Sequence, residues 1–176
     1  MDTTLRDGEQ TSGVSFAAHE KLSIAQALLD LGVNRLEIAS ARVSDGEFEA
    51  VKRVASWAER TGNIQKLEVL GFVDGHTSVD WIQSTGCRVI NLLCKGSLKH
   101  CTHQLKKTPE EHIEDIINVV HYADELDIAV NVYLEDWSNG MKDSPEYVFQ
   151  LMDGLKATSI KRYMLQIGRA SCRERV

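Results

Sequence analysis

Short, continuous apolar runs alternate along the chain with longer segments that show helical periodicity. The short runs are rich in Val, Ile and Leu, which is typical of strands covered on both faces. Their spacing of roughly 25 to 35 residues predicts parallel strands joined by right-handed crossovers. We predict these strands at residues 36–39, 67–72, 89–94, 129–134 and 162–165.

Helices are predicted between these runs, at residues 19–31, 45–60, 108–126 and 144–155. In the third helix, Thr108 and Glu111 match a capping box, with Pro109 at the first helical position. Asp45 and Ser144 are interpreted as residues that start helices rather than as functional residues.

This alternation fits two architectures, a doubly wound open sheet and a (β/α)8 barrel, and periodicity alone does not separate them. In both architectures, ligands bind at the carboxyl ends of the strands. A first strand is predicted to run into Asp7, and polar residues follow the later strands as well. We therefore expect one site where these loops converge. The residues concerned are Asp7, Ser40, Arg42, Asp74, His76, Ser97, His100, Glu135 and Asp136.

Composition narrows the class of protein. The 176 residues suit one domain, and 43% apolar with 26% charged residues is typical of a soluble globular protein. The net charge of −6 leaves no basic stripe that could neutralise nucleic-acid phosphates. No apolar run reaches the roughly 18 residues of a membrane span. We therefore expect no nucleic-acid or membrane partner and a cytoplasmic location.

The most specific segment is Asp2-Thr-Thr-Leu-Arg-Asp-Gly-Glu-Gln10. It joins the cation Arg6 to the carboxylate Asp7, followed by a glycine in a tight turn. A carboxylate is a hard oxygen ligand for a divalent ion, and a guanidinium stabilises negative charge that develops on an oxygen. The structural alternative is an Arg–Asp ion pair that only closes the turn, and these two residues alone do not exclude it.

This segment resembles the first-strand signature of a metallolyase superfamily built on (β/α)8 barrels. The superfamily includes 2-isopropylmalate, homocitrate and citramalate synthases and hydroxymethylglutaryl-CoA lyase. The resemblance runs through residues 1–165 and is closest to the bacterial (R)-citramalate synthase branch at residues 36–47, 71–75, 91–100 and 131–140. It implies an α/β fold, an incomplete TIM (β/α)8 barrel of about the first five to six β/α units.

The resemblance also implies a reaction. A 2-oxo acid chelates a divalent metal, acetyl-CoA loses a methyl proton, and the resulting enolate attacks the ketone before the thioester is hydrolysed. By resemblance, Asp7 is a metal ligand, Arg6 is a catalytic residue that polarises the bound ketone, and Glu135 is the catalytic carboxylate. These three side chains are expected to meet around one ion. The metal is Mg²⁺, Mn²⁺ or Zn²⁺, and acetyl-CoA is the co-substrate.

Substrate choice is expected to depend on Leu70, Leu93 and Tyr133, which the resemblance places around the methyl group of pyruvate. Tyr133 lies two residues before Glu135, so both side chains point to the same side of a strand. A ring at this position leaves little space for an isopropyl group, so we expect pyruvate to be preferred over 2-oxoisovalerate. The two leucines could also simply pack the barrel interior. Residues expected to support the site are Gln10, Glu37, Ser40 and His100.

Other functions stay open. A 2-isopropylmalate synthase is favoured if Tyr133 swings away, and a lyase of the same superfamily is a further alternative. A homocitrate synthase is disfavoured because we expect no basic residue on the strands around the substrate that could bind a distal carboxylate. A non-catalytic α/β binding module belongs to a different class. The resemblance implies small-molecule substrates, a 2-oxo acid and acetyl-CoA, and a homodimer of the full-length enzyme.

The end of the chain departs from the family. Residues 1–166 are interpreted as the N-terminal part of the catalytic barrel. Residues 167–176 can be written in codons as ATC GGA AGA GCG TCG TGT AGG GAA AGA GTG, which resembles a widely used sequencing adapter. We interpret them as a translated adapter rather than an ordinary basic tail. The family's His-x-His metal ligands and its acetyl-CoA site are expected outside this chain, so the chain alone is predicted to be inactive and prone to aggregation.

Overall fold

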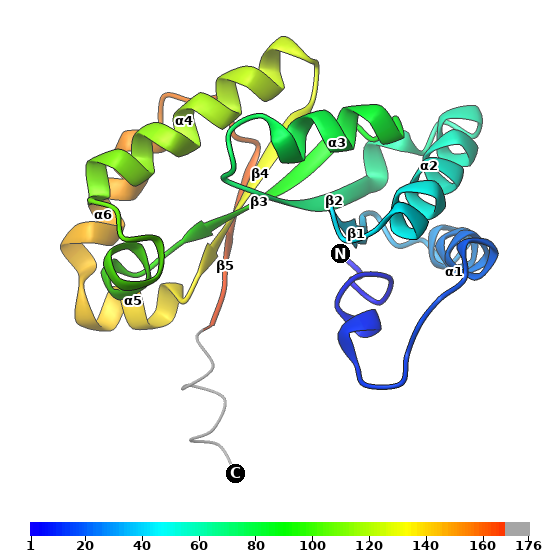
Figure 1. Cartoon of the computed structure of the whole chain (residues 1–176), viewed down its shortest axis with the longest axis horizontal. Coiled ribbons are helices and arrows are strands. Elements are labelled where there is room, and N and C mark those ends of the chain that lie inside the picture. Colours follow the sequence, from blue (N-terminus) through cyan, green and yellow to red (C-terminus); the bar gives the residue numbers. More distant parts are fainter. Residues whose placement is uncertain (168–176) are drawn as a thin grey trace. The chain divides into compact units, whose positions relative to one another are not determined.

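The computed structural model describes residues 1–167, and the expected adapter-derived tail lies outside them apart from Ile167. Strands and helices alternate along this part of the chain (Figure 1). The strands are β1 (Leu36–Ser40), β2 (Leu67–Phe72), β3 (Val89–Lys95), β4 (Ala129–Glu135) and β5 (Arg162–Leu165). The α-helices are α1 (Ala18–Asp30), α2 (Asp45–Arg60), α3 (Thr77–Thr85), α4 (Pro109–Glu125), α5 (Trp137–Asp143) and α6 (Pro145–Leu155). Two 3-10 helices, η1 (Gly8–Gln10) and η2 (Ile64–Lys66), and a π-helix, η3 (His100–Leu105), complete the described elements.

The strands follow the chain order β1-β2-β3-β4-β5 in one five-stranded sheet. The β1–β2 and β4–β5 pairs are parallel. A doubly wound sheet reverses its strand order at a switch point, whereas successive strands of a barrel are neighbours. The observed order therefore confirms the α/β class and decides between the two predicted architectures in favour of an incomplete (β/α)8 barrel.

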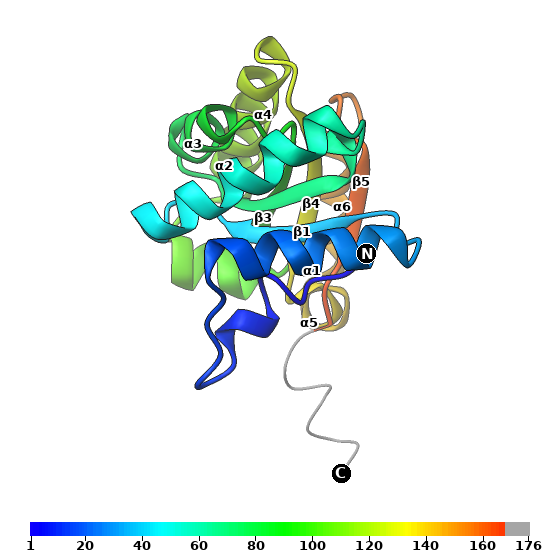
Figure 2. The same ribbon diagram turned by 90° about the vertical axis from the view of Figure 1, so that its right-hand side faces the viewer.

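The chain forms two compact units. Unit 1 contains residues 1–71, 76–90 and 126–128, and unit 2 contains residues 72–75, 91–125 and the described residues from 129 onward. In unit 1, α1 packs on α2 and lies beside β1 (Figure 2). The core side of α2 is made of Val51, Val54, Ala55 and Ala58, which are nearly inaccessible to solvent.

In unit 2, the apolar face of the strands packs against α4. Cys94 on β3 and the alternate residues Val130, Val132 and Leu134 on β4 are almost completely buried. Helices α4 and α6 pack against each other, and α5 packs against α6. With one strand face filled in this way, the opposite face is left for the polar side chains described below.

The predicted capping box of α4 is confirmed. Thr108 N–H donates to Glu111 Oε2 at 2.8 Å, and Glu111 N–H donates to Thr108 Oγ1 at 3.2 Å. The five strands predicted from residue 36 onward are all present, with ends within one residue of their predicted positions. Helices α3 and α5 were not predicted, because each is short: the two span nine and seven residues.

The predicted position of Ser144 at the start of a helix is confirmed, because it is the N-cap residue of α6, although it makes no side-chain capping bond. The Ser144 hydroxyl instead accepts a hydrogen bond from Leu98 N–H at 3.3 Å and donates to Gly140 O at 3.2 Å. The reason is that α5 ends immediately before α6, so the hydroxyl is used to join two elements rather than to begin one. Within residues 1–167, no helix has both the length and the apolar character needed to span a bilayer.

Candidate active site

Arg6 is held by two carboxylates in unit 1. Its Nε donates a hydrogen bond to Glu37 Oε2 at 2.6 Å, and its Nη2 lies 2.5 Å from the same oxygen. Nη1 donates to Asp7 Oδ1 at 2.8 Å. The Glu37 side chain is inaccessible to solvent, whereas that of Asp7 is 62% exposed. The guanidinium is thus fixed from its buried side, and within the described residues these contacts use three of its five N–H donors.

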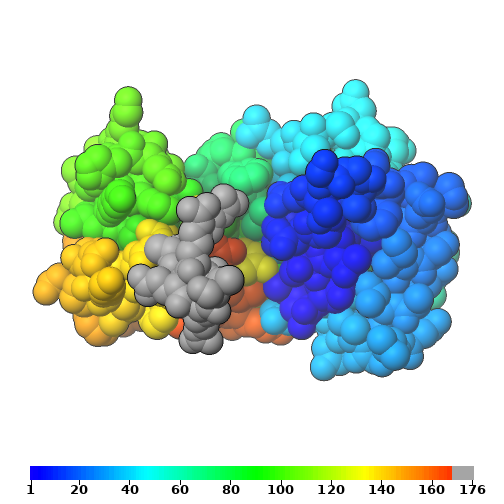
Figure 3. All heavy atoms as spheres, turned by 90° about the horizontal axis from the view of Figure 1, so that it is seen from below, coloured from blue at the N-terminus to red at the C-terminus, as the bar shows by residue number. Residues whose placement is uncertain are grey.

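A tight turn presents this pair at the surface. Asp2 accepts hydrogen bonds from Thr4 N–H at 2.9 Å and from the Thr4 hydroxyl at 3.2 Å, and Asp7 N–H donates to Thr3 O at 2.7 Å. The prediction of a strand that runs into Asp7 is wrong. The Asp2 side chain bends the backbone, so only an isolated bridge to Leu36 forms. Figure 3 shows this N-terminal segment, in dark blue, on the molecular surface.

Lys21, which is only 1% exposed, anchors the same segment from within unit 1. Its Nζ lies 2.7 Å from Glu9 Oε2 and 2.5 Å from Glu47 Oε1, and it donates to Leu5 O at 3.2 Å. A buried ammonium requires such partners. Burial raises the pKa of Glu47, although the adjacent ammonium opposes this shift. Leu5 and Glu9 lie on either side of Arg6 and Asp7 in the sequence. The buried ammonium of Lys21 therefore fixes this N-terminal segment at both ends.

A second group of candidate residues lies on one face of β3 and β4 in unit 2. Asn131 Nδ2 donates a hydrogen bond to Asn91 Oδ1 at 2.9 Å. Four residues further along each strand, Lys95 Nζ forms an ion pair with Glu135 Oε2. Side chains an even number of positions apart share a strand face, so both pairs lie on the same side of the sheet. The expectation that the strands around the substrate carry no basic residue is therefore wrong.

Leu93 and Tyr133 lie midway between these two polar pairs and on the same face. Tyr133 is 6% exposed, and Leu93 is half-buried. In β5, Met164 is in register with Tyr133. The face thus presents an aliphatic and aromatic layer between an amide pair and an ion pair, an arrangement suited to a small substrate with one apolar end and one polar end.

Two buried side chains hold the end of β3. Lys95 N–H donates to His112 Nε2 at 3.1 Å, and Lys95 O accepts from Tyr147 Oη at 2.8 Å. Burial lowers the pKa of His112 to about 4, so the ring stays neutral and its Nε2 stays an acceptor. Burial also raises the pKa of Tyr147, which keeps its hydroxyl a donor. The next residue, Gly96, donates from its N–H to Glu135 O at 2.7 Å.

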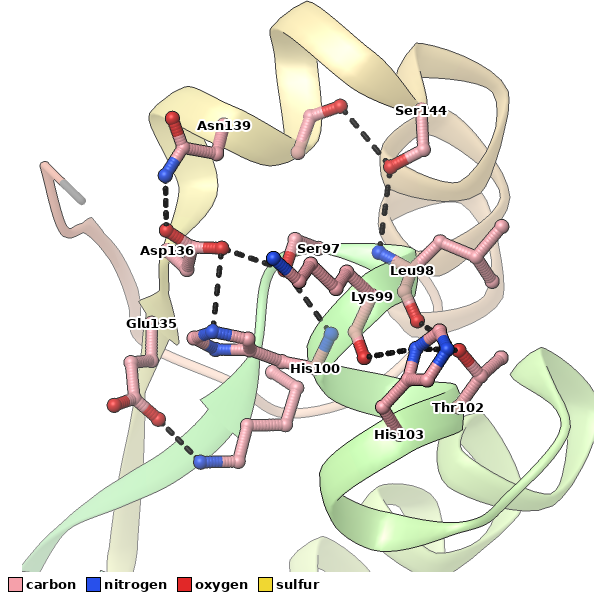
Figure 4. A network of polar contacts seen from close by, with 12 residues as sticks. Ser97, Leu98, Lys99, His100, Thr102, His103, Glu135, Asp136, Asn139 and Ser144 are labelled. Carbon is pink, nitrogen blue, oxygen red and sulfur yellow. Dashed lines mark hydrogen bonds and ion pairs between the residues drawn. The ribbon is translucent and has the colours of Figure 1, made fainter. Parts of the chain in front are cut away.

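Asp136 joins the loop after β3 to the loop after β4 (Figure 4). Its Oδ2 accepts from Ser97 Oγ at 2.8 Å and lies 3.5 Å from His100 Nε2, while its Oδ1 accepts from Asn139 Nδ2 at 2.6 Å. The Asp136 backbone has φ 62°, a left-handed conformation that aspartate tolerates better than most residues. The structure therefore brings His100 together with Ser97 and Asp136.

The remaining predicted site residues are divided between the two units. Arg6, Asp7 and Glu37 form one cluster in unit 1, where Leu70 is 7% exposed on β2. Ser40, half-buried at the end of β1, is in register with Leu70, and Gln10 is exposed at the end of η1. In unit 2, Leu93, Tyr133 and Glu135 share a strand face. The expected convergence of Arg6 and Asp7 with Glu135 stays a prediction.

A divalent metal was expected, and the described residues contribute one ligand to it at most. Within residues 1–167, no three side chains of His, Cys, Asp or Glu lie close enough together to hold a metal ion. Asp7 offers an exposed carboxylate whose Oδ1 already accepts from Arg6. One carboxylate falls short of the three or four protein ligands typical of a zinc site. These residues do not form a metal site by themselves.

Sequence reasoning missed the ion pair between Lys95 and Glu135. The missed signal lies in the two strands. Residues 91–95 and 131–135 both read Asn, apolar, large, apolar, charged, and the charges at the fifth position have opposite signs. Two neighbouring strands with this shared pattern place a Lys opposite a Glu.

Known proteins resemble the chain over most of its length. The HMGL-like family matches residues 1–165. A putative (R)-citramalate synthase from Methanothermobacter thermautotrophicus is 34% identical over 158 residues, which are 89% of this chain and 30% of that protein. A 2-isopropylmalate synthase from Prochlorococcus marinus is also 34% identical, over 87% of this chain and 28% of its own length. The chain thus spans less than a third of the length of these relatives.

Solved structures share the fold. The crystal structure of hydroxymethylglutaryl-CoA lyase from Pseudomonas aeruginosa matches with a TM-score of 0.71 over 94% of this chain and 56% of that chain. Its sequence is 14% identical, so the likeness concerns the fold alone.

Proposed function

We propose that this chain, which belongs to the HMGL-like family, is part of an acetyl-CoA-dependent enzyme that condenses an acetyl group with a 2-oxo acid. The observation that carries the proposal is the clamp on Arg6, whose guanidinium is bound by fully buried Glu37 and by exposed Asp7. A cation fixed in this way can meet an oxyanion without reorganising first. The similar synthases favour a carbon–carbon condensation over the other reactions of this fold.

In the proposed reaction, Arg6 binds the ketone oxygen of the 2-oxo acid through its two remaining N–H donors. Glu135 takes a proton from the methyl group of acetyl-CoA; the C–H bond breaks, and its electron pair forms the enolate. The enolate carbon bonds to the ketone carbon, and the ketone oxygen becomes an alkoxide that Arg6 stabilises. The alkoxide takes up a proton to become a hydroxyl group. Water then adds to the thioester carbonyl, the C–S bond breaks, and coenzyme A leaves as a thiol.

Asp7 is proposed as one carboxylate ligand of the divalent cation. The remaining ligands, the acetyl-CoA site and the expected dimer contacts would belong to parts of the longer protein that the described residues do not include. The described residues themselves therefore support binding and positioning of the ketone by Arg6 and proton transfer at Glu135.

Pyruvate is the proposed 2-oxo acid, with (R)-citramalate as the product. The support is the buried Tyr133 ring, two residues before Glu135 on β4 and on the same strand face. A ring held at 6% exposure limits the space beside the reacting carbon. A 2-isopropylmalate synthase, which would use 2-oxoisovalerate, is the alternative, because one such enzyme shares 34% identity with the chain.

The test uses the full-length parent enzyme, obtained from its complete reading frame. Release of the coenzyme A thiol is followed with acetyl-CoA and either pyruvate or 2-oxoisovalerate. We expect kcat/KM for pyruvate to exceed that for 2-oxoisovalerate by at least ~10-fold, since steric exclusion adds to the loss of apolar contact. Thiol release with neither acid would refute the proposed reaction class.

Two variants test the substrate assignment. Tyr133→Ala removes the ring and is expected to raise the ratio of kcat/KM for 2-oxoisovalerate to that for pyruvate by ~10-fold or more. Tyr133→Phe keeps the ring and is the matched control, with the ratio unchanged. Equal ratios in the native enzyme and in Tyr133→Ala would show that Tyr133 does not limit the size of the substrate.

A further inference from the structure

We propose that Lys95 is a positioning residue for Glu135 in the condensation, a role that rests on the function proposed above. Lys95 ends β3 and Glu135 ends β4, and their side chains form an ion pair on the face that also carries Leu93 and Tyr133. The ammonium aims the carboxylate along this face before the proton transfer.

The backbone of Lys95 is held independently of Glu135. Its N–H donates to His112 Nε2 at 3.1 Å, and its carbonyl accepts from Tyr147 Oη at 2.8 Å. His112 is 1% exposed and Tyr147 is 3% exposed, so both anchors are rigid parts of the core of unit 2. A strand end fixed by two buried side chains places the Lys95 side chain at a defined position whether or not the ion pair forms.

The backbone of Glu135 is held as well. Its carbonyl accepts from Gly96 N–H at 2.7 Å, and a Cβ added at Gly96 would lie 3.0 Å from that same carbonyl oxygen. The following residue, Asp136, is tied to Ser97 and Asn139 (Figure 4). The two chain segments therefore approach as closely as a glycine permits, and both members of the ion pair project from fixed backbones.

In this geometry, the two carboxylate oxygens of Glu135 have different roles: one binds Lys95 and the other is proposed to accept a proton. Oε2 is engaged by the ammonium of Lys95. Within residues 1–167, the hydrogen bond and the ion pair of the Glu135 carboxylate both use Oε2, and we assign Oε1 to receive the methyl proton of acetyl-CoA. The C–H bond breaks, the proton binds to Oε1, and the electron pair remains on the carbon as the enolate. A carboxylate that is already oriented needs no rotation before it accepts the proton.

The ion pair is also partly shielded from water, which strengthens its hold on the carboxylate. The Lys95 side chain is 16% exposed and the Glu135 side chain is 35% exposed. By contrast, the Lys156–Asp153 pair in the same unit is 72% and 74% exposed. Water and salt screen the attraction between two exposed charges such as Lys156 and Asp153, so their side chains can rotate. The Lys95–Glu135 pair is buried enough to keep one orientation.

The experiment compares Lys95→Met, Lys95→Arg and the control Lys156→Met in the full-length parent enzyme. Methionine keeps the length and apolar stem of lysine but removes the charge, and the backbone anchors on His112 and Tyr147 stay in place. Measurements are kcat, KM for each substrate, the thermal midpoint, and the isotope effect with acetyl-CoA deuterated at the methyl group. The native enzyme is assayed first.

We expect Lys95→Met to lower kcat by ~100-fold, within the range of general acid–base contributions. Its KM values should stay within about threefold, and its deuterium isotope effect should rise because proton transfer becomes slower than later steps. Lys95→Arg is expected to recover a large part of kcat, and Lys156→Met to behave as native. The fold changes in kcat and in the isotope effect are what a purely structural role would not produce.

Three results would overturn the proposal. The first is a Lys95→Met enzyme that keeps more than half of the native kcat. The second is a loss that appears only in KM or in the thermal midpoint while the isotope effect is unchanged. The third is an inactive native enzyme with both 2-oxo acids, which would remove the proposed function and this role together; native activity with an unaffected Lys95→Met variant would remove this role alone.

Discussion

At the scale of single residues, the candidate site depends on cations bound by carboxylates. Arg6 lies against buried Glu37, and Lys21 is bound by Glu9 and Glu47. Removing one partner of a buried ion pair leaves the other charge uncompensated, which typically costs about 3–5 kcal/mol. These pairs therefore keep the Arg6–Asp7 segment in one conformation.

A second residue-scale feature is the close approach of Gly140 to Gly96. A Cβ added at Gly140 would lie 2.0 Å from the Gly96 carbonyl oxygen, far inside van der Waals contact. The clash is with backbone, which a rotamer change does not relieve. Because Gly96 follows Lys95 and bonds to Glu135 O, a shift here also moves the proposed Lys–Glu pair.

We predict that Gly140→Ala lowers the free energy of unfolding by about 3 kcal/mol, the upper part of the range for overpacking. The matched control is Gly46→Ala, where the added Cβ would have only Ser44 Oγ nearby, at 3.8 Å. This control is expected to be neutral or slightly stabilising. Thermal unfolding midpoints of the two variants in the parent enzyme check the prediction, and equal midpoints would contradict it.

At the scale of elements, α4 controls the end of β3 through His112. The helix begins at its confirmed capping box, and His112 lies one residue after Glu111 on the buried side of the helix. Its Nε2 must stay unprotonated to accept the Lys95 N–H. Burial favours that neutral form and lowers the pKa to about 4.

This lowered pKa makes stability depend on pH. The unfolded chain binds a proton at this histidine below its ordinary pKa of 6.5, whereas the folded chain does so only near pH 4. Stability from this group is therefore complete above pH 6.5 and declines as the pH falls towards 4. The expected loss approaches about 3 kcal/mol, at roughly 1.36 kcal/mol per pKa unit.

Thermal midpoints measured from pH 7 to pH 4 check this prediction in the parent enzyme. His112→Gln keeps an acceptor group without a titrating ring, so its midpoint should fall less steeply over this window than that of the native enzyme. His121→Gln replaces an exposed histidine of the same helix and is the matched control, with the native slope. A native slope in His112→Gln would show that another group causes the pH dependence.

At the scale of the whole molecule, the chain corresponds to less than a third of the length of the two similar synthases. It covers 30% of one similar synthase and 28% of another. Within residues 1–167, the expected metal site has one candidate ligand, Asp7, and no group of three ligating side chains. Arg6 and Glu135 can position groups, but the proposed reaction needs partners that these residues do not include.

We therefore predict that the 176-residue chain alone shows no condensing activity. Thiol release from acetyl-CoA with pyruvate should stay at the uncatalysed rate, with or without added Mg²⁺, Mn²⁺ or Zn²⁺. The full-length parent, assayed in parallel, is the control that shows the assay works. Turnover by the isolated chain would mean that the described residues form a sufficient site.

The alternation of strands and helices could be predicted because it depends on local burial. Residues 67–72 and 162–165 are strands with the predicted ends, and the capping box at Thr108 forms as its sequence predicts. The short helices α3 and α5 and the turn at Asp2 could not, because few residues carry too little periodicity and a side-chain hydrogen bond can outweigh strand preference.

The five strands, the four longer helices, the Arg6–Asp7 motif and the family resemblance could be read from the sequence, because periodicity and residue identity are properties of neighbouring positions. Only the tertiary structure decided that the strands follow in barrel order, that Glu37 holds Arg6 and that Lys95 pairs with Glu135. Those contacts join residues that are 31 and 40 positions apart. Their geometry depends on strand register and on buried anchors such as His112, which no local pattern specifies.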